Sequence, residues 1–161
     1  MTRRHLLFFA LLACAAVATA QEKGPKPPQK DLPYLLEANR LIPTDAQPAT
    51  RSTAKDDVTI TVAGVTSKVR TPLPEPIFLF SSGQIDPQQF ELIRFQVSDG
   101  GRHWKKGQPI QQGDEPDEPL RLTLSPKGEK LYRIEASPML AAGEYAIIAR
   151  GQNTAFCFTV F

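Results

Sequence analysis

From residue 56 to its end, the chain consists of short runs in which apolar and polar residues alternate, separated by Gly, Pro and Asp. In the first run, Val58, Ile60 and Val62 share one face, which is the two-residue repeat of a half-buried β-strand. Further alternating or continuous apolar runs follow at 65–70, 77–80, 90–97, 102–104, 120–124, 131–135, 145–149 and 155–160. This spacing, with no long helical period, predicts an all-β fold, an antiparallel β-sandwich over residues 56–161.

Turn sequences predict which of these runs pair. Asp99-Gly100 offers the two positive-φ positions of a tight hairpin turn between 90–97 and the run that begins at Arg102. The segment Ser125–Gly128 predicts a second hairpin, between the runs at 120–124 and 131–135. The last two runs, joined by residues 150–154, form a third pair.

Residues 21–55 differ in composition, because they contain six of the fifteen prolines and one of the ten glycines. Proline-rich chains of this kind form extended, semi-rigid linkers. Within the linker, the apolar residues between 32 and 42 follow a helical repeat, and Asp31 stands where an N-cap is expected. The pattern predicts one short helix near 33–41, which either packs on the sandwich as a lid or serves as a docking segment for another protein.

The first twenty residues have the three parts of a secretory signal peptide. Two arginines and a histidine at 3–5 precede an apolar run over 6–17, and Ala18-Thr19-Ala20 supplies the small residues that signal peptidase requires. The run is too short to span a bilayer core about 30 Å thick, and it lacks the polar face of a buried N-terminal helix. The sequence predicts a signal peptide over 1–20 and an exported protein, periplasmic or extracellular.

Two variants of this export signal stay open. Leu11-Leu12-Ala13-Cys14 resembles the box in which bacterial lipoproteins are acylated on cysteine, which makes Cys14 a candidate lipidation site. Against lipidation, the residues after Cys14 remain apolar, whereas a lipidated cysteine is usually followed by a polar tether. Residues 2–7 resemble a twin-arginine export signal, although the strongly apolar core suits the general route better.

The charge of the chain outside the signal peptide is balanced. Two of the nineteen Lys and Arg residues fall within 1–20, so residues 21–161 carry seventeen basic and seventeen acidic side chains. No basic cluster is longer than Lys105-Lys106. Such a chain lacks the electrostatic surface that binds a phosphate backbone, which argues against nucleic acid. The expected partner is another envelope or extracellular protein, or a glycan, and no transmembrane span is predicted after residue 20.

Cys14 and Cys157 are the two cysteines, so the chain after residue 20 has one thiol and no intramolecular disulfide. On the two-residue repeat of a strand, Cys157 faces away from Phe156 and Phe158. If the phenylalanines face the core, the thiol faces outward or into a second layer. It is a candidate for an intermolecular disulfide, or it packs as free cysteines commonly do.

His103 is the single histidine after residue 20 and stands beside Trp104 near a predicted hairpin. The pair is a candidate ligand-binding site, with ordinary sheet packing as the alternative. Residues 114–118 hold four carboxylates, but Pro116 and the spacing differ from a calcium loop, so a solvated loop is the simpler interpretation. The known nucleophile, phosphate-loop, zinc and dinucleotide motifs are absent, and we assign no catalytic residue, metal or cofactor.

Leu140, Gly143 and Tyr145 form the motif L-x-x-G-x-Y at the start of the penultimate run. The motif resembles the tyrosine corner of Greek-key sandwiches of the immunoglobulin-like and fibronectin type III-like families. The resemblance implies an immunoglobulin-like fold in which the Tyr145 hydroxyl bonds to backbone a few residues upstream and Gly143 eases the bend. It covers residues 130–161 best, without the paired cysteines and core tryptophan of antibody domains. The chain is also similar to uncharacterised exported bacterial proteins.

These observations predict a non-enzymatic β-sandwich on a proline-rich stalk that binds an envelope component or an extracellular ligand. The expected contact is the segment 32–42 or an edge strand of a sheet. A second hypothesis is a small secreted hydrolase or carbohydrate-binding accessory domain. Its site would lie at His103, Trp104 and the acidic loop.

Overall fold

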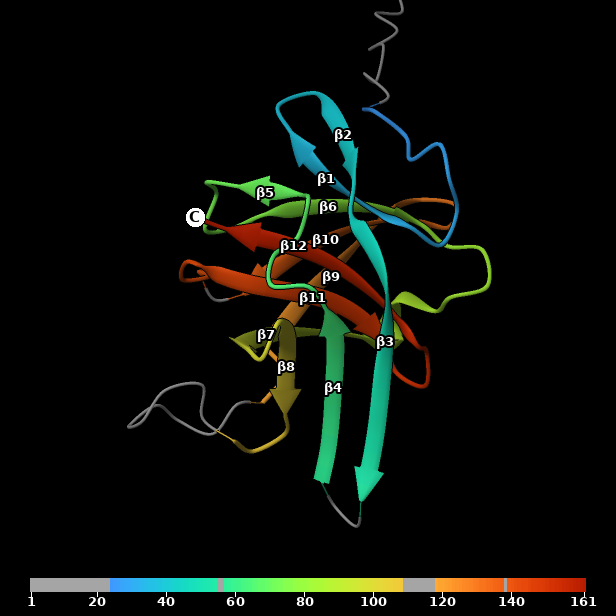
Figure 1. The fold of residues 1–161 in the computed structure, drawn as a ribbon. Coiled ribbons are helices and arrows are strands. Elements are labelled where there is room, and N and C mark those ends of the chain that lie inside the picture. The colour runs from blue at the N-terminus through green and yellow to red at the C-terminus, as the bar shows by residue number, and fades with distance from the viewer. Residues whose placement is uncertain (1–23, 55–56, 109–117, 138) are drawn as a thin grey trace, which may run out of the picture.

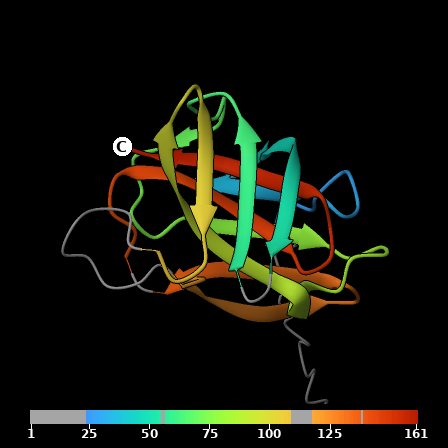
Figure 2. The same cartoon turned by 60° about the horizontal axis from the view of Figure 1, so that its bottom comes forward.

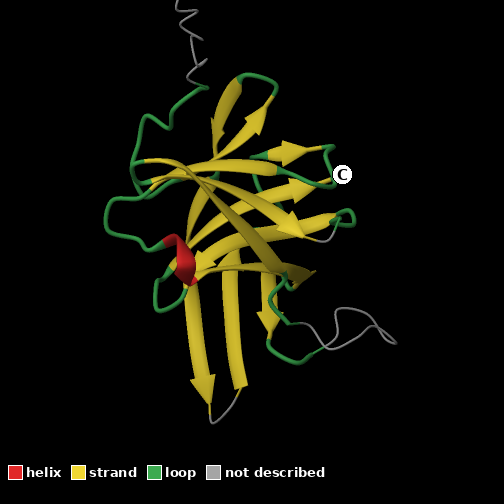
Figure 3. Cartoon of the chain, turned by 180° about the vertical axis from the view of Figure 1, so that it is seen from behind, coloured by secondary structure: helices red, strands yellow, loops and turns green. Residues whose placement is uncertain are grey.

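The computed structural model describes residues 24–54, 57–108, 118–137 and 139–161. Almost all of its regular structure is β-strand, and the single helical turn among the described residues is the 3-10 turn η1 (Figure 3). The elements in chain order are β1 (Pro33–Glu37), β2 (Arg40–Pro43), β3 (Asp45–Ala54), β4 (Asp57–Ala63), β5 (Arg70–Thr71), β6 (Ile77–Ser81), η1 (Pro87–Gln89), β7 (Phe90–Ser98), β8 (Gly101–Lys105), β9 (Arg121–Gly128), β10 (Leu131–Ser137), β11 (Gly143–Ala149) and β12 (Thr154–Val160) (Figure 1).

Six antiparallel strands close into a barrel in the order β11-β7-β8-β4-β3-β12, because β12 also pairs with β11. Figure 2 shows β7, β8, β4 and β3 side by side along the barrel wall. The two-residue strand β5 extends the same sheet by running parallel to the end of β12. A barrel of so few strands is narrow enough for side chains to fill its interior.

A second sheet, in the order β2-β1-β6-β10-β9, packs against the outer face of β7, β11 and β12. The phenylalanines of β12 belong to this layer. The Phe158 ring lies 4.9 Å from that of Phe78 on β6 and stacks at 5.6 Å on Tyr145 of β11. The barrel strands β11 and β12 are therefore buried on both faces, one against the barrel interior and one against the second sheet.

The predicted immunoglobulin-like sandwich is wrong, because the larger sheet closes on itself. The strand that closes it is β3, which the sequence places in the linker. Its first half pairs with β12 and its second half pairs with β4. The side chains that β3 turns inward are Asp45, Gln47, Ala49 and Arg51. The strand therefore lacks the apolar face from which a strand is predicted in a sequence.

The predicted helix near 33–41 is also wrong, and residues 33–54 are not a linker. The segment forms the β1–β2 hairpin, in which Leu35 pairs with Ile42 on the inward face and Leu35 is fully buried. Apolar residues at these spacings fit a helical repeat and a hairpin equally well. Ala38, at φ 51°, makes the turn.

Asp31 does not cap a helix but ties the start of the fold to the loop after β6. Its carboxylate accepts backbone N–H bonds from Gly83, Gln84 and Ile85 at 2.7–3.0 Å. Burial on its own raises the pKa of Asp31, but these hydrogen bonds outweigh it and hold the pKa below 3.8. The carboxylate is therefore ionised at neutral pH and fixes the chain just before β1.

Two of the three predicted hairpins are confirmed in place. Asp99 and Gly100, at φ 48° and 74°, join β7 to β8, and β11 pairs with β12. The turn between β9 and β10 lies later than predicted, because β9 continues to Gly128 and Lys130 adopts the left-handed conformation.

The local bond implied by the L-x-x-G-x-Y motif is confirmed. The Tyr145 hydroxyl donates to the Ala141 carbonyl oxygen at 2.7 Å, and Leu140 is buried in the core. A Cβ on Gly143 would lie 3.0 Å from Nε of Arg94, so this position favours a residue without a side chain. The motif therefore makes its corner within a barrel strand.

Candidate functional site

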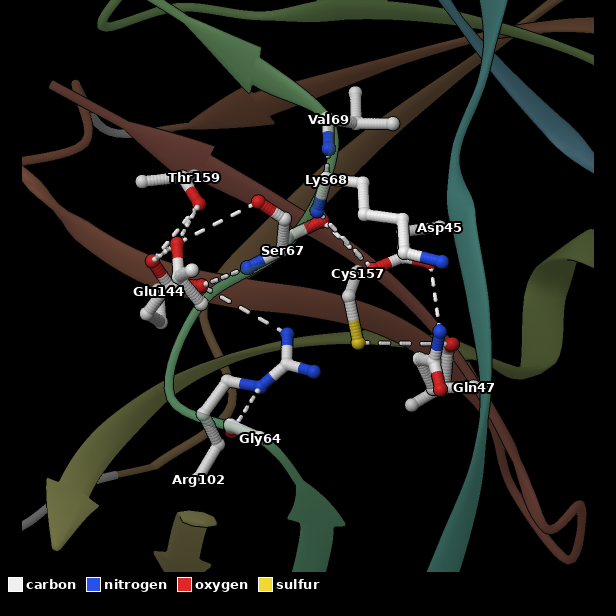
Figure 4. A network of polar contacts seen from close by, with 12 residues as sticks. Asp45, Gln47, Gly64, Ser67, Lys68, Val69, Arg102, Glu144, Cys157 and Thr159 are labelled. Carbon is white, nitrogen blue, oxygen red and sulfur yellow. Dashed lines mark hydrogen bonds and ion pairs between the residues drawn. The ribbon is translucent and has the colours of Figure 1, made fainter. Parts of the chain in front are cut away.

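A cluster of polar side chains fills the end of the barrel where β4 stops and the loop 64–69 begins (Figure 4). Alternation along β8 and β11 turns Arg102 and Glu144 inward, and they are 1% and 8% exposed. Nη1 of Arg102 lies 3.7 Å from Oε2 of Glu144. Nε and Nη2 of Arg102 donate to the carbonyl oxygens of Gly64 and Ala63, both at 3.1 Å. This buried ion pair occupies one end of the barrel.

Glu144 also holds the loop that crosses this end. Its Oε1 accepts from the hydroxyls of Thr66 and Thr159 at 2.9 and 2.8 Å. Its Oε2 accepts the backbone N–H of Ser67 at 2.9 Å. The loop is thereby attached to β11 through side-chain and backbone bonds.

Asp45 holds the same loop from β3, which is separated from β11 by β12. Its Oδ2 accepts from the Ser67 hydroxyl and from the backbone N–H of Lys68, both at 3.2 Å, while Oδ1 accepts from Gln47 at 2.7 Å. Burial raises the pKa of Asp45, but these hydrogen bonds outweigh it and keep the pKa below 3.8. Two carboxyl side chains, one from β3 and one from β11, therefore clamp the loop.

Cys157 lies in the barrel interior beside this cluster and is fully buried. Burial raises the pKa of its thiol to about 12, even though Arg102 acts in the opposite direction. The thiol stays protonated and is a poor nucleophile. The second layer that it faces is the barrel interior, and an intermolecular disulfide would require the barrel to open.

His103 and Trp104 do not form a joint site, because consecutive strand residues face opposite ways. The His103 ring lies within hydrogen-bond distance of Thr61 Oγ1 at 3.3 Å and of the Ser98 carbonyl oxygen at 3.2 Å. Trp104 faces the barrel interior and is 4% exposed. The acidic cluster lies outside the described residues except for Glu118, and so do Cys14 and the predicted signal peptide, which stay predictions.

Five large apolar side chains are exposed among the described residues: Val65, Leu73, Val97, Met139 and Phe161. Four of them lie on the segment 64–74 or on the segments bonded to it at 139–140 and 161, and we name this set, Val65, Leu73, Met139 and Phe161, the C-terminal surface.

Two backbone hydrogen bonds connect the chain segments that carry these residues. The N–H of Phe161 donates to the Thr71 carbonyl oxygen, and the N–H of Leu140 donates to the Pro74 carbonyl oxygen. Within the segment 64–74, the N–H of Leu73 donates to the Thr71 hydroxyl. Val65 belongs to the clamped loop itself. The C-terminal surface is thus built on the segment 64–74 and the strand ends beside it.

Two concavities among the described residues are lined by none of the side chains of the polar cluster. One, of about 440 Å³, contains the Arg133–Glu135 pair, whose nitrogen and oxygen are 2.8 Å apart. The other, of about 400 Å³, contains Glu91 and Arg150, which are 2.7 Å apart. In both concavities, these charged side chains are already paired with each other and are therefore less available to bind a ligand.

Comparison of the chain with models of protein families, with curated proteins and with solved structures gives no match. Within the described ranges, no helix is long and apolar enough to cross a membrane. The same residues contain no group of three His, Cys, Asp or Glu side chains placed to hold a metal ion. The function must therefore be inferred from the sequence and the geometry of the described residues.

Sequence reasoning missed the Arg102–Glu144 pair. Arg102 stands beside the chosen His103 and Trp104, and Glu144 lies inside the L-x-x-G-x-Y motif, yet each resembles an ordinary surface charge. The available signal is register: Arg102 and Trp104 share a face, and so do Glu144 and Ala146, so a charge continues an otherwise apolar interior face.

Proposed function

We propose that the chain is an exported, non-enzymatic binding module that contacts another protein of the cell envelope or extracellular space through its C-terminal surface. The observation that carries the proposal is the exposure of its four large apolar side chains, 43–66% each, on chain segments that backbone hydrogen bonds hold together. Apolar side chains that gather on a surface and are rimmed by polar groups mark contact sites. Export rests on the signal peptide predicted at residues 1–20.

The charges beside the surface define the chemistry of the partner. Lys68 and Arg70 are exposed and make no ion pair with a described residue. The Arg70 guanidinium lies 4.7 Å from the centre of the Phe161 ring, which places a cation directly on the apolar surface. A complementary partner combines apolar side chains with carboxylates.

The edge strand β5 borders this surface, but it is poorly suited to accept an added strand. It is two residues long and is followed by Pro72, which has no N–H to donate. Contact through side chains is therefore the mode that the surface supports. The clamped loop supplies rigidity, because a contact surface held in place before binding loses less entropy on association.

The proposal predicts which substitutions abolish capture of a partner. A full-length protein with an affinity tag inserted after Gln21 is recovered from its native envelope, and co-purified proteins are quantified by mass spectrometry. The double variant Leu73→Asp/Phe161→Asp is expected to lose at least tenfold of the recovery of any specific partner, because two carboxylates then face the partner's own acidic groups.

The matched control is Ala54→Asp, which adds a carboxylate at the exposed end of β3. It is expected to recover the partner as well as the wild type does. Equal recovery by the double variant and the wild type, or the absence of a protein that both the wild type and Ala54→Asp enrich over the double variant, would overturn the proposal. Unfolding midpoints of all variants show whether they are folded.

A further inference from the structure

A second arginine on the inward face of the barrel wall, the half-buried Arg51, has no counter-charge among the described residues. Arg51 follows Ala49 by two residues on β3, so both face the barrel interior. Its Nε and Nη2 atoms are buried and have no hydrogen-bond acceptor. Arg51 forms no ion pair with any described residue.

Trp104 presents a further unpaired donor at the same level of the barrel. Arg51 pairs across the sheet with Ile60, and Ile60 pairs with Trp104, so the two side chains flank Ile60 on the inner wall. With strands about 4.8 Å apart, their Cα atoms are separated by about 10 Å. The indole Nε1 is buried and has no acceptor either.

The polar cluster at the other end shows how this fold accommodates a buried arginine. Arg102 has Glu144 opposite its charge, and carbonyl oxygens accept from its Nε and Nη2, so that its Nη1 alone lacks a hydrogen-bond acceptor. The same two atoms of Arg51 lack acceptors. A native protein rarely leaves a buried donor unpaired, since the group has lost its water without replacement.

The geometry of these unpaired donors matches one kind of acceptor. Nε and Nη2 form one edge of the guanidinium and present two parallel N–H bonds, which match the two oxygens of a carboxylate. One carboxylate carries one negative charge, which neutralises one guanidinium. Phosphate carries more charge than this single cation balances.

We propose that the Arg51 end of the barrel binds the carboxylate of a ligand, with the Arg51 edge donating two hydrogen bonds and the Trp104 indole donating a third. The site is separate from the C-terminal surface and does not depend on the proposed protein contact. Trp104, selected in the sequence for its neighbour His103, acts here with Arg51 instead.

The experiment uses the single tryptophan of the chain as its reporter. In the ¹H–¹⁵N spectrum of the uniformly ¹⁵N-labelled full chain, one indole N–H peak arises, that of Trp104. Sodium acetate, titrated against sodium chloride at equal ionic strength, is expected to move this peak downfield with a saturable dependence. Sodium phosphate is the second arm, and an equal saturable response to phosphate would overturn the choice of a carboxylate.

Two variants separate binding from a structural role. Arg51→Met is expected to abolish the acetate response and to raise the Tm in acetate-free buffer, because an apolar side chain removes unpaired buried N–H groups. Arg40→Met removes an arginine whose side chain is 80% exposed, and it is expected to respond as the wild type does. A peak unmoved by acetate, an equal response in Arg51→Met, or a lowered Tm in that variant would overturn the proposal.

Discussion

Replacing Glu144 with alanine is expected to lower the free energy of unfolding by about 3–5 kcal/mol, the range for breaking a buried ion pair from one side. The variant leaves Arg102, which is 1% exposed, without its ion-pair partner. It also removes the acceptor of Thr66, Ser67 and Thr159. Urea unfolding at neutral pH, followed by tryptophan fluorescence, measures the difference.

Two controls distinguish this mechanism from the loss of any ion pair. Glu91, with a side chain 20% exposed, pairs at 2.7 Å with Arg150, whose side chain is 63% exposed, so the pair stays solvated and Glu91→Ala is expected to cost less than about 1 kcal/mol. The double variant Arg102→Met/Glu144→Leu removes both charges and is expected to recover most of the lost stability. If Glu144→Ala costs no more than Glu91→Ala, the buried pair is not what stabilises this end of the barrel.

Replacing Phe158 with alanine is expected to destabilise the protein by about 3–5 kcal/mol, the range for a buried phenylalanine that leaves a cavity. Phe158 is fully buried between the barrel and the second sheet. Its ring contacts Tyr145 on one layer and Phe78 on the other, so the cavity would open where the layers meet. Thermal and denaturant unfolding measure the loss.

The matched control is Phe161→Ala, three residues later on the same chain segment. Phe161 is 61% exposed, so its truncation is expected to change stability by less than about 0.5 kcal/mol. The same substitution weakens partner capture if the C-terminal surface is the contact. Equal destabilisation by the two variants would contradict the assignment of Phe158 to the core and Phe161 to the surface.

The alternation of apolar residues was sufficient to predict most strands, but not the closure of the larger sheet into a barrel. Val58, Ile60 and Val62 alternate as expected for β4, and Asp99-Gly100 makes the β7–β8 turn. The strand β3 was not predicted, because it turns the polar side chains of Asp45, Gln47 and Arg51 toward the barrel interior. Its pairing with both β12 and β4, which converts a sandwich into a barrel, depends on contacts distant in sequence.

The site followed the same pattern. Trp104 was selected as a binding residue and is buried with an unpaired N–H, but its neighbour His103 faces away. Arg102 and Glu144 could not be recognised as partners, because their strands, β8 and β11, do not pair directly and come together only when the barrel forms. A buried charge is visible in the sequence only when the facing direction of its strand is known.

Amide hydrogen exchange of Ser67 and Lys68 in the native full chain tests most directly whether the carboxyl groups of Glu144 and Asp45 hold the loop beside the C-terminal surface. These N–H groups donate to Glu144 and Asp45. We expect both amides to exchange as slowly as those of the barrel strands, and Ser67 to exchange much faster in Glu144→Ala. Exchange at the rate of an unstructured peptide in the wild type would contradict the account.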